Sequence, residues 1–393
     1  SIVLSQAGLT FLALAGGTAP PLQSFLVVNG GQGTLNWGVT ATTLSGGPGW
    51  LAVSPASGSS AAGQAGPPVV TRVNPAGLAA GDYYGQVEVR SPAAPNSPQF
   101  VTVVLNVVTP GREAGVSVSP SGMIFTGPAG GANPAAQALT LTALATQPVS
   151  FAATPSFGEG RGWFTAQPAS GNIPPGQAAR VEVRPNVSGF AGGVYDGVLT
   201  FVFGDNTVRL VRLLLVVSPG VAGGVAQAVC TPARLLPVFT SLGANFSVTA
   251  GWPAPLEVRV VDDCGRPMTA GTVVSSFSNG DPPVTLASLQ EGRWGGTWQG
   301  RSAGAGRATV TVEARSTAPE LTGTAQVEGD LRANPNPPPE VATGGVLHAA
   351  SFARGFPLAP GSLVSIFGTR LAAGTTVAPS LPLPPELGGT TAA

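Results

Sequence analysis

One nine-residue stretch that occurs twice limits what this chain can fold into. Residues 50–58 read WLAVSPASG, and residues 163–171 read WFTAQPASG. Each copy begins with a tryptophan, continues as a short apolar run and ends in a Pro-Ala-Ser-Gly sequence, the pattern of a short strand followed by a turn. Because Trp50 and Trp163 open the stretch at matching positions, we interpret both as core anchors of a repeated β domain, with stacking on a sugar as the alternative.

Further landmarks recur around this stretch. Residues 5–11, 23–27 and 81–85 return as residues 119–125, 137–141 and 193–197, with offsets of 112–114 residues. A long apolar run, residues 100–108 or 209–217, closes each copy. A fixed period across several landmarks indicates tandem copies of one domain.

Glycine and proline punctuate runs of Val, Leu, Thr and Phe, and no stretch has helical periodicity. Many short strands separated by turns are typical of β-sandwiches. We therefore predict an all-β fold of tandem Ig-like antiparallel β-sandwiches, arranged as beads along an elongated rod. The predicted domains are residues 1–110, 111–220 and 221–333, and residues 334–393 form a Pro-rich linker, an incomplete β segment and a tail.

The first two units resemble BACON-like domains, Ig-like sandwiches of secreted bacterial proteins. The resemblance rests on PLQSFLVVNGG, LNW, WLAVSPASG and NPAGLAAGDYYGQVEV, and the second copy lacks an equivalent of Trp37. The family name suggests carbohydrate binding, although many members look like spacers. Residues 221–333 are similar to invasin-type Ig-like repeats. Residues 344–371, with GGVLHAASF and PLAPGSLVSIFGTRL, resemble the start of a C-terminal domain of unknown function on secreted proteins of soil bacteria, in which Asn usually stands at the position of His348.

Charge is sparse and balanced, with 18 basic and 18 acidic residues. No basic patch is available to neutralise phosphates, which argues against nucleic acid as a partner. All basic residues are arginines, which excludes lysine Schiff-base chemistry. The first charged residue is Arg72, but Gly and Pro interrupt the neutral stretch before it could span a membrane. The chain starts at Ser1, and we interpret it as a mature product without its signal peptide, or as a fragment.

Cys230 and Cys264 fall in one predicted domain. In a secreted protein two such cysteines favour a disulfide, and two free buried thiols are the alternative.

Candidate sites are few. His348 is the only histidine, and no nucleophile is marked near it, so we expect no catalytic residues and no cofactor. Asp262 and Asp263 could ligate calcium, but no run of alternating acids accompanies them, so we interpret them as a turn and expect no metal. Trp294 and Trp298 lie four residues apart on a predicted strand, hence on one face, and are the candidates for an exposed glycan platform.

We therefore predict a non-enzymatic, secreted protein of the cell surface, a fibre or matrix subunit that assembles head to tail into a homopolymer. The assembly would use β-strand addition through the uncharged N-terminal segment or through the C-terminal segment and tail. The candidate assembly strand comprises Leu363, Val364, Ser365, Ile366, Phe367 and Gly368. The alternative is a carbohydrate-binding or adhesive array with a polysaccharide as partner.

Overall fold

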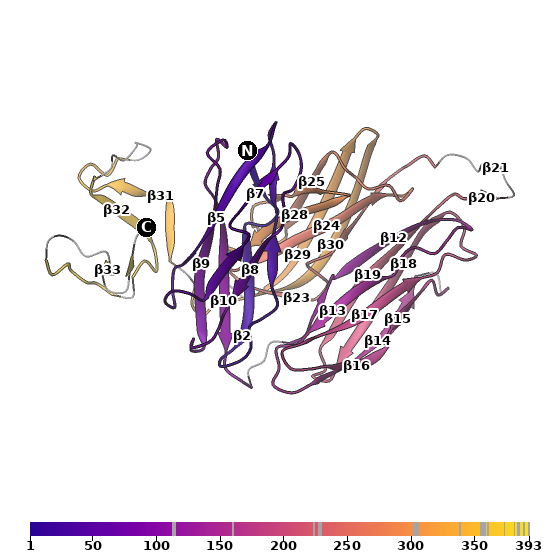
Figure 1. Cartoon of the computed structure of the whole chain (residues 1–393), viewed down its shortest axis with the longest axis horizontal. Helices are drawn as coiled ribbons and strands as arrows, with labels where there is room; N and C mark the ends of the chain where they lie inside the picture. Colours follow the sequence, from indigo (N-terminus) through magenta and orange to yellow (C-terminus); the bar gives the residue numbers. More distant parts are fainter. Residues whose placement is uncertain are drawn as a thin grey trace. The chain divides into compact units, whose positions relative to one another are not determined.

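The computed structural model describes residues 1–111, 115–158, 161–222, 225–226, 230–301, 306–337, 339–353, 359, 361–372, 374–380, 382, 386–387 and 390–391. Every regular element in these residues is a β-strand. The strands form three sandwiches, coloured indigo, magenta and orange along the chain in Figure 1, and several short two-stranded sheets. The predicted all-β class is confirmed.

The first sandwich contains ten strands. These are β1 Ile2–Leu4, β2 Gly8–Leu14, β3 Gln23–Phe25, β4 Val27–Asn29, β5 Leu35–Thr43, β6 Leu51–Ser54, β7 Ser57–Ser60, β8 Val69–Val73, β9 Gly81–Arg90 and β10 Gln99–Val108. One layer is a five-stranded sheet of order β2-β10-β9-β5-β7, and the other consists of β3-β8-β6 and β1-β4. The run at residues 23–29 therefore supplies two strands, β3 and β4, which belong to different sheets.

The second sandwich repeats this plan. Its strands are β11 Ser117–Ser119, β12 Gly122–Pro128, β13 Gln137–Thr142, β14 Val149–Phe157, β15 Phe164–Gln167, β16 Ser170–Ile173, β17 Ala178–Pro185, β18 Gly193–Phe203 and β19 Val208–Ser218. The sheets have the orders β12-β19-β18-β14-β16 and β11-β13-β17-β15.

The third sandwich follows the short pair β20 Val221–Ala222 and β21 Val225–Ala226. Its strands are β22 Leu235–Phe239, β23 Phe246–Thr249, β24 Pro253–Asp262, β25 Thr272–Phe277, β26 Val284–Thr285, β27 Ala287–Gln290, β28 Arg293–Gln299, β29 Gly306–Thr317 and β30 Glu320–Arg332. The sheets have the orders β23-β30-β29-β25-β26 and β22-β24-β28-β27.

One topological feature is common to all three sandwiches. The second strand of each runs parallel to the last: β2 to β10, β12 to β19, and β23 to β30. The remaining strand pairs of the five-stranded sheets are antiparallel. The third sandwich therefore shares the plan of the first two, although its sequence does not repeat theirs.

The repeated stretch that begins with tryptophan carries the chain from one sheet to the other. In the first copy β6 lies in the smaller sheet and β7 in the five-stranded sheet, and β15 and β16 do the same in the second copy. Trp50 and Trp163 are 3% and 1% exposed and lie in the cores of the two sandwiches. Both residues are thus buried where the chain changes sheet.

The second sandwich does contain an equivalent of Trp37, which corrects the sequence comparison. Trp37 on β5 lies opposite Gly58, and Phe151 on β14 lies opposite Gly171. A Cβ added to either glycine would meet the facing aromatic ring, so both glycines leave room for a ring. The comparison missed the pair because the ring changes from indole to phenyl.

Residues Ser1–Ala333 form one compact unit, in which the third sandwich contacts both others. Thr10 Oγ1 donates to the carbonyl oxygen of Pro253 at 2.8 Å, and the backbone N–H of Ala7 donates to Thr297 Oγ1 at 2.8 Å. These bonds join the first sandwich to the third. In the predicted row of beads each domain would contact only its neighbours in sequence. The bonds between the first and third sandwiches correct that part of the prediction.

Residues Asn334–Ala393 form a separate unit. It contains β31 Glu340–His348, β32 Val364–Thr369, β33 Glu386–Leu387 and β34 Thr390–Thr391, arranged as the hairpins β31-β32 and β33-β34. Within the predicted assembly tail, residues 374–393, the residues 381, 383–385, 388–389 and 392–393 lie outside the described residues.

Candidate functional site

The second and third sandwiches meet through an apolar interface. Its cluster of side chains, each at most 2% exposed, consists of Ile124, Leu214, Val216, Val238 and Val261. The backbones also approach each other, because the N–H of Ser121 donates to the carbonyl oxygen of Thr240 at 2.9 Å. A Cβ on Gly122 would collide with the carbonyl oxygen of Phe239. Two cavities lie in this interface.

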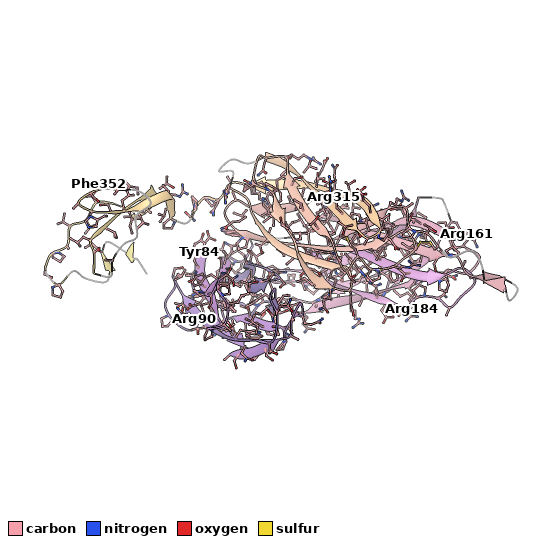
Figure 2. All side chains as sticks on the ribbon, turned by 90° about the horizontal axis from the view of Figure 1, so that it is seen from above. Tyr84, Arg90, Arg161, Arg184, Arg315 and Phe352 are labelled. Carbon is pink, nitrogen blue, oxygen red and sulfur yellow. A yellow bond between two sulfur atoms is a disulfide. The ribbon has the colours of Figure 1, made fainter. Side chains whose placement is uncertain are left out.

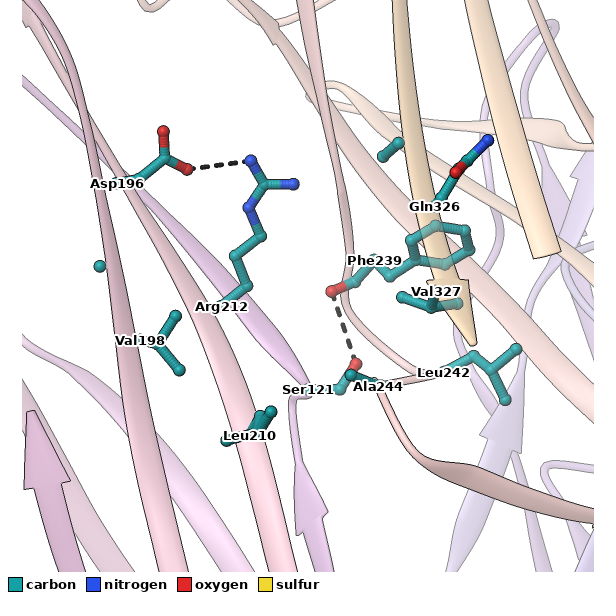
Figure 3. Close-up of a pocket in the computed structure, with 13 residues that line it drawn as sticks. Ser121, Asp196, Val198, Leu210, Arg212, Phe239, Leu242, Ala244, Gln326 and Val327 are labelled. Atoms are coloured by element: carbon teal, nitrogen blue, oxygen red, sulfur yellow. Dashed lines mark hydrogen bonds and ion pairs between the residues drawn. The ribbon is translucent and has the colours of Figure 1, made fainter. Parts of the chain in front are cut away.

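The first, which we call the Ser121 cavity, has a volume of about 220 Å³ (Figure 3). The second sandwich contributes Ser121, Asp196, Gly197, Val198, Leu210 and Arg212, and the third contributes Phe239, Leu242, Gly243, Ala244, Ala325, Gln326 and Val327. Arg212 Nη2 donates to Asp196 Oδ1 at 2.9 Å, and both side chains are 53% exposed. Ser121 Oγ donates to the carbonyl oxygen of Phe239 at 3.4 Å.

The charged groups and the hydroxyl of the Ser121 cavity are therefore engaged with each other or with the backbone. The carboxylate of Asp196 is paired with a guanidinium, and the hydroxyl of Ser121 is paired with a carbonyl, so no base faces a nucleophile here. The opposite wall carries the apolar side chains of Phe239 and Val327 (Figure 3). This lining suits contact with a small uncharged group.

The second, which we call the Arg259 cavity, has a volume of about 230 Å³. It is lined by Pro120, Gly122, Met123, Ile124 and Gln137 from the second sandwich and by Thr240, Glu257, Val258, Arg259, Leu289, Arg293 and Trp294 from the third. Its charged residues are Glu257, Arg259 and Arg293, all from β24 and β28. The alternation of residues 256–261 (LEVRVV) places Glu257 and Arg259 on one face, but only the pairing of β24 with β28 brings Arg293 beside them.

Trp294 and Trp298 do not form an exposed platform, which corrects the sequence-based expectation. They are 4% and 1% exposed and belong to the core of the third sandwich. Trp298 stacks on Phe277 with ring centroids 4.8 Å apart, and its Nε1 donates to Asp281 Oδ2 at 2.8 Å. The two residues share a face as predicted, but that face is the core because the other face of β28 is turned toward the neighbouring sandwiches.

Asp281 has a structural role that the sequence did not reveal beyond a turn at residues 279–281. Its carboxylate accepts bonds from Trp298, from the amide of Asn279 and from the backbone N–H of Arg301. The carboxylate therefore anchors this turn to the core of the third sandwich.

Cys230 and Cys264 form a disulfide, the pairing that the sequence favoured, with a sequence separation of 34. Next to it, Asp262 Oδ1 accepts bonds from the backbone N–H groups of Cys264 and Arg266 at 2.9 and 2.8 Å. Asp263 Oδ1 accepts from the N–H of Ala233 at 2.9 Å. Both aspartates thus act as acceptors for backbone amides, in line with the turn interpretation.

His348 is exposed on β31. Its Nδ1 accepts from the backbone N–H groups of Ala350 and Ser351 at 3.2 and 3.4 Å. The ring therefore caps the chain that follows β31. In the ranges that the structure describes, no three His, Cys, Asp or Glu side chains gather into a set that could hold a metal ion.

The candidate assembly strand corresponds to β32, which pairs antiparallel with β31. Apolar side chains are exposed on this hairpin and next to it: Val341 48%, Val346 44%, Leu363 69%, Val364 39%, Ile366 38% and Phe367 49%. Phe352, 52% exposed, lies against Phe367 with ring centroids 6.1 Å apart. Among the described residues β32 has one partner strand, so its other edge carries no strand.

The N-terminal segment differs from the hairpin. β1 pairs with β4, and Ile2 is buried in the first sandwich. The amide of Asn96 bonds both the N–H and the carbonyl oxygen of Ile2, each at 2.8 Å. The side chain thus occupies backbone groups of β1 that an added strand would need.

Each sandwich has an ion pair on its surface, and Figure 2 labels the arginines of three such pairs, Arg90, Arg184 and Arg315. Arg184 Nη2 lies 2.8 Å from Glu182 Oε2, and this hydrogen bond and the positive charge lower the pKa of the Glu182 carboxyl. Exposed pairs of this kind contribute little to stability. The described part of the chain contains no helix that could cross a lipid bilayer.

Three of the solved structures to which this chain is similar have low sequence identity to it. The seventh PapD-like domain of human CEP192 is 13% identical over 29% of this chain and 92% of that chain, with a TM-score of 0.24. Drosophila N-cadherin EC1-4 is 13% identical over 83% and 73% of the two chains, with a TM-score of 0.24. An endo-fucoidan hydrolase of glycoside hydrolase family 107 is 13% identical over 82% and 43%, with a TM-score of 0.21.

A search of curated proteins found no match. A family model described as the viral BACON domain matches residues 5–107 and 116–211, which together make up half of the chain. The match stops at residue 211, so the invasin-type and C-terminal resemblances remain predictions. The two matched segments correspond to the first two sandwiches, and the chain belongs to the viral BACON domain family.

Proposed function

We propose that this chain is a non-enzymatic, extracellular structural protein, a subunit that assembles head to tail into a surface fibre or matrix by β-strand addition. The disulfide of the third sandwich supports an extracellular location, since such bonds persist in oxidising compartments. The hairpin β31-β32 carries the assembly part of the proposal.

Two physical features of the hairpin support strand addition. A two-stranded hairpin is marginally stable by itself in water. The unpaired edge of β32 presents backbone N–H and C=O groups, and Ile366 and Phe367 present exposed apolar surface beside it. An edge strand of a second copy would satisfy these groups and cover these side chains. If the added edge strand is one other than β32, the contact joins two different surfaces, and repetition without closure yields a filament.

The test compares the full chain with a variant that lacks residues 341–393, by electron microscopy and size-exclusion chromatography. We expect filaments from the full chain and soluble monomers from the shortened one. A sharper pair is the double variant Ile366→Asp and Phe367→Asp against Val202→Asp. Val202 is 46% exposed and lies on β18, which has a partner strand on each side, so its variant adds a charge outside the segments assigned to assembly. Filaments that persist in the double variant, or that are lost equally in Val202→Asp, contradict the proposal.

A further inference from the structure

The Arg259 cavity holds two guanidinium groups with no acid between them. Arg259 on β24 and Arg293 on β28 are directly opposite in the antiparallel register. Like charges at such positions repel and destabilise the strand pair. Among the described residues neither guanidinium has an ion-pair partner. The wall holds two guanidinium groups and the one carboxylate of Glu257, so the site carries a net positive charge.

The guanidinium of Arg259 also lacks acceptors. Among the described residues its side chain makes no hydrogen bond, its Nε is buried, and the residue lines the cavity. A buried N–H without an acceptor is unfavourable, and native proteins satisfy nearly all such groups. Trp294 Nε1 is buried without a partner as well, but its indole lies in the core of the third sandwich. A bound group with acceptor oxygens would supply partners for the guanidinium of Arg259.

The other polar residues of the wall do not fill this role. Glu257 Oε1 accepts a bond at 3.0 Å from Gln6 Nε2 of the first sandwich. Gln137 Nε2 donates to the carbonyl oxygen of Ile124 at 2.9 Å. The remaining lining residues of the second sandwich are uncharged. Two cations and one already engaged carboxylate leave a net positive wall.

We propose that the Arg259 cavity binds the carboxylate of a small ligand. Guanidinium groups recognise carboxylates through two parallel N–H···O bonds, and the pair of arginines suits this geometry. Met123, Ile124 and Leu289 offer apolar contact to the body of the ligand. A volume of about 230 Å³ limits the ligand to one small unit, and the exposed side chain of Arg293 places the arginines at an entry from solvent. The bound carboxylate belongs either to a uronic acid residue of a polysaccharide or to a free small carboxylic acid.

The experiment titrates the full chain with galacturonate, acetate and galactose by isothermal calorimetry. We expect galacturonate to bind and galactose, which has the ring but no carboxylate, to bind at least tenfold more weakly. Galacturonate binding tighter than acetate identifies a sugar acid as the source, and equal binding identifies a small free acid. Both results support the carboxylate site. Absence of binding by both anions, or equal binding of galactose and galacturonate, overturns it.

Variants Arg259→Gln and Arg293→Gln locate the binding, with Arg307→Gln as the matched control. Arg307 is an exposed arginine of the same sandwich that pairs with Glu328 outside the cavity. We expect the two cavity variants to lose affinity at least tenfold and the control to keep it. Unliganded Arg259→Gln should melt no lower than the parent, because it removes a like-charge repulsion. Unchanged affinity in both cavity variants, or a lower melting temperature of unliganded Arg259→Gln, contradicts the proposal.

Discussion

Replacement of Gly122 by alanine tests whether the second and third sandwiches pack as the structure shows. Gly122 begins β12, which pairs in parallel with β19. An added Cβ would lie 2.7 Å from Val238 Cγ1 and would overlap the carbonyl oxygen of Phe239. The carbonyl belongs to the backbone of β22 and cannot rotate away. The methyl group therefore has to push the two sandwiches apart.

The expected cost follows from overpacking. Inserting one methyl into a closely packed interface costs about 1–3 kcal/mol. Each kcal/mol lowers the melting temperature by about 2–4 °C for a domain of 150–250 residues. Separation also exposes the apolar cluster around Ile124 and Val238, which adds to the loss. We expect the melting temperature to fall by about 2–12 °C.

The measurement is differential scanning calorimetry of Gly122→Ala beside Gly38→Ala. Gly38 lies on β5. A Cβ added there would lie 3.8 Å from the nearest atom, the carbonyl oxygen of Ala56, which is an ordinary contact. Replacing a glycine by alanine where the methyl group fits stabilises the folded protein by about 0.4–1 kcal/mol, because the unfolded chain has less conformational entropy to lose. The two variants should therefore move in opposite directions. Equal melting temperatures would refute the close approach at Gly122.

Two further changes test the interior of the third sandwich. Replacing Cys230 and Cys264 by serine releases a loop with a sequence separation of 34, and the chain-entropy relation gives a loss of about 4 kcal/mol, measured as a lower urea midpoint. Trp298→Phe keeps an aromatic ring beside Phe277 but removes the donor to the half-buried carboxylate of Asp281. Loss of this hydrogen bond should cost about 1–3 kcal/mol in the same assay. A midpoint equal to that of the parent in either case would contradict the assigned contact.

The sequence predicted the parts of the fold that depend on local pattern. The repeat placed Trp50 and Trp163 at one structural position, and both are buried where the chain changes sheet. The recurring tyrosine was equally informative, because Tyr83 and Tyr195 donate to the carbonyl oxygens of Ala79 and Ala191, four residues earlier in each copy. The fixed spacing between the two copies identifies such positions, because the same local backbone geometry requires the same type of residue in each copy.

Contacts between sandwiches could not be predicted in this way. The period-two pattern of β28 shows that Trp294 and Trp298 share a face, but it does not say which face is the core. That choice depends on Ala7 and Thr297, which lie 290 residues apart in sequence and meet across the interface. The Arg259 cavity has the same origin, because its charged residues come from two strands and part of its apolar wall, Met123 and Ile124, comes from another sandwich. Only the assembled chain brings these groups together.

The two repeated copies dock on the third sandwich through equivalent positions, and this yields a last test. Gly8 begins β2 as Gly122 begins β12, and a Cβ on Gly8 would lie 2.5 Å from Pro253 Cγ of the third sandwich. Each copy thus uses a glycine at the start of its parallel edge strand for close approach. The nearest atom is Pro253 Cβ, which is bonded to the backbone and moves little when the ring changes pucker. Gly8→Ala should therefore lower the melting temperature as Gly122→Ala does. An unchanged melting temperature of Gly8→Ala in calorimetry would contradict the close approach of the first sandwich to the third.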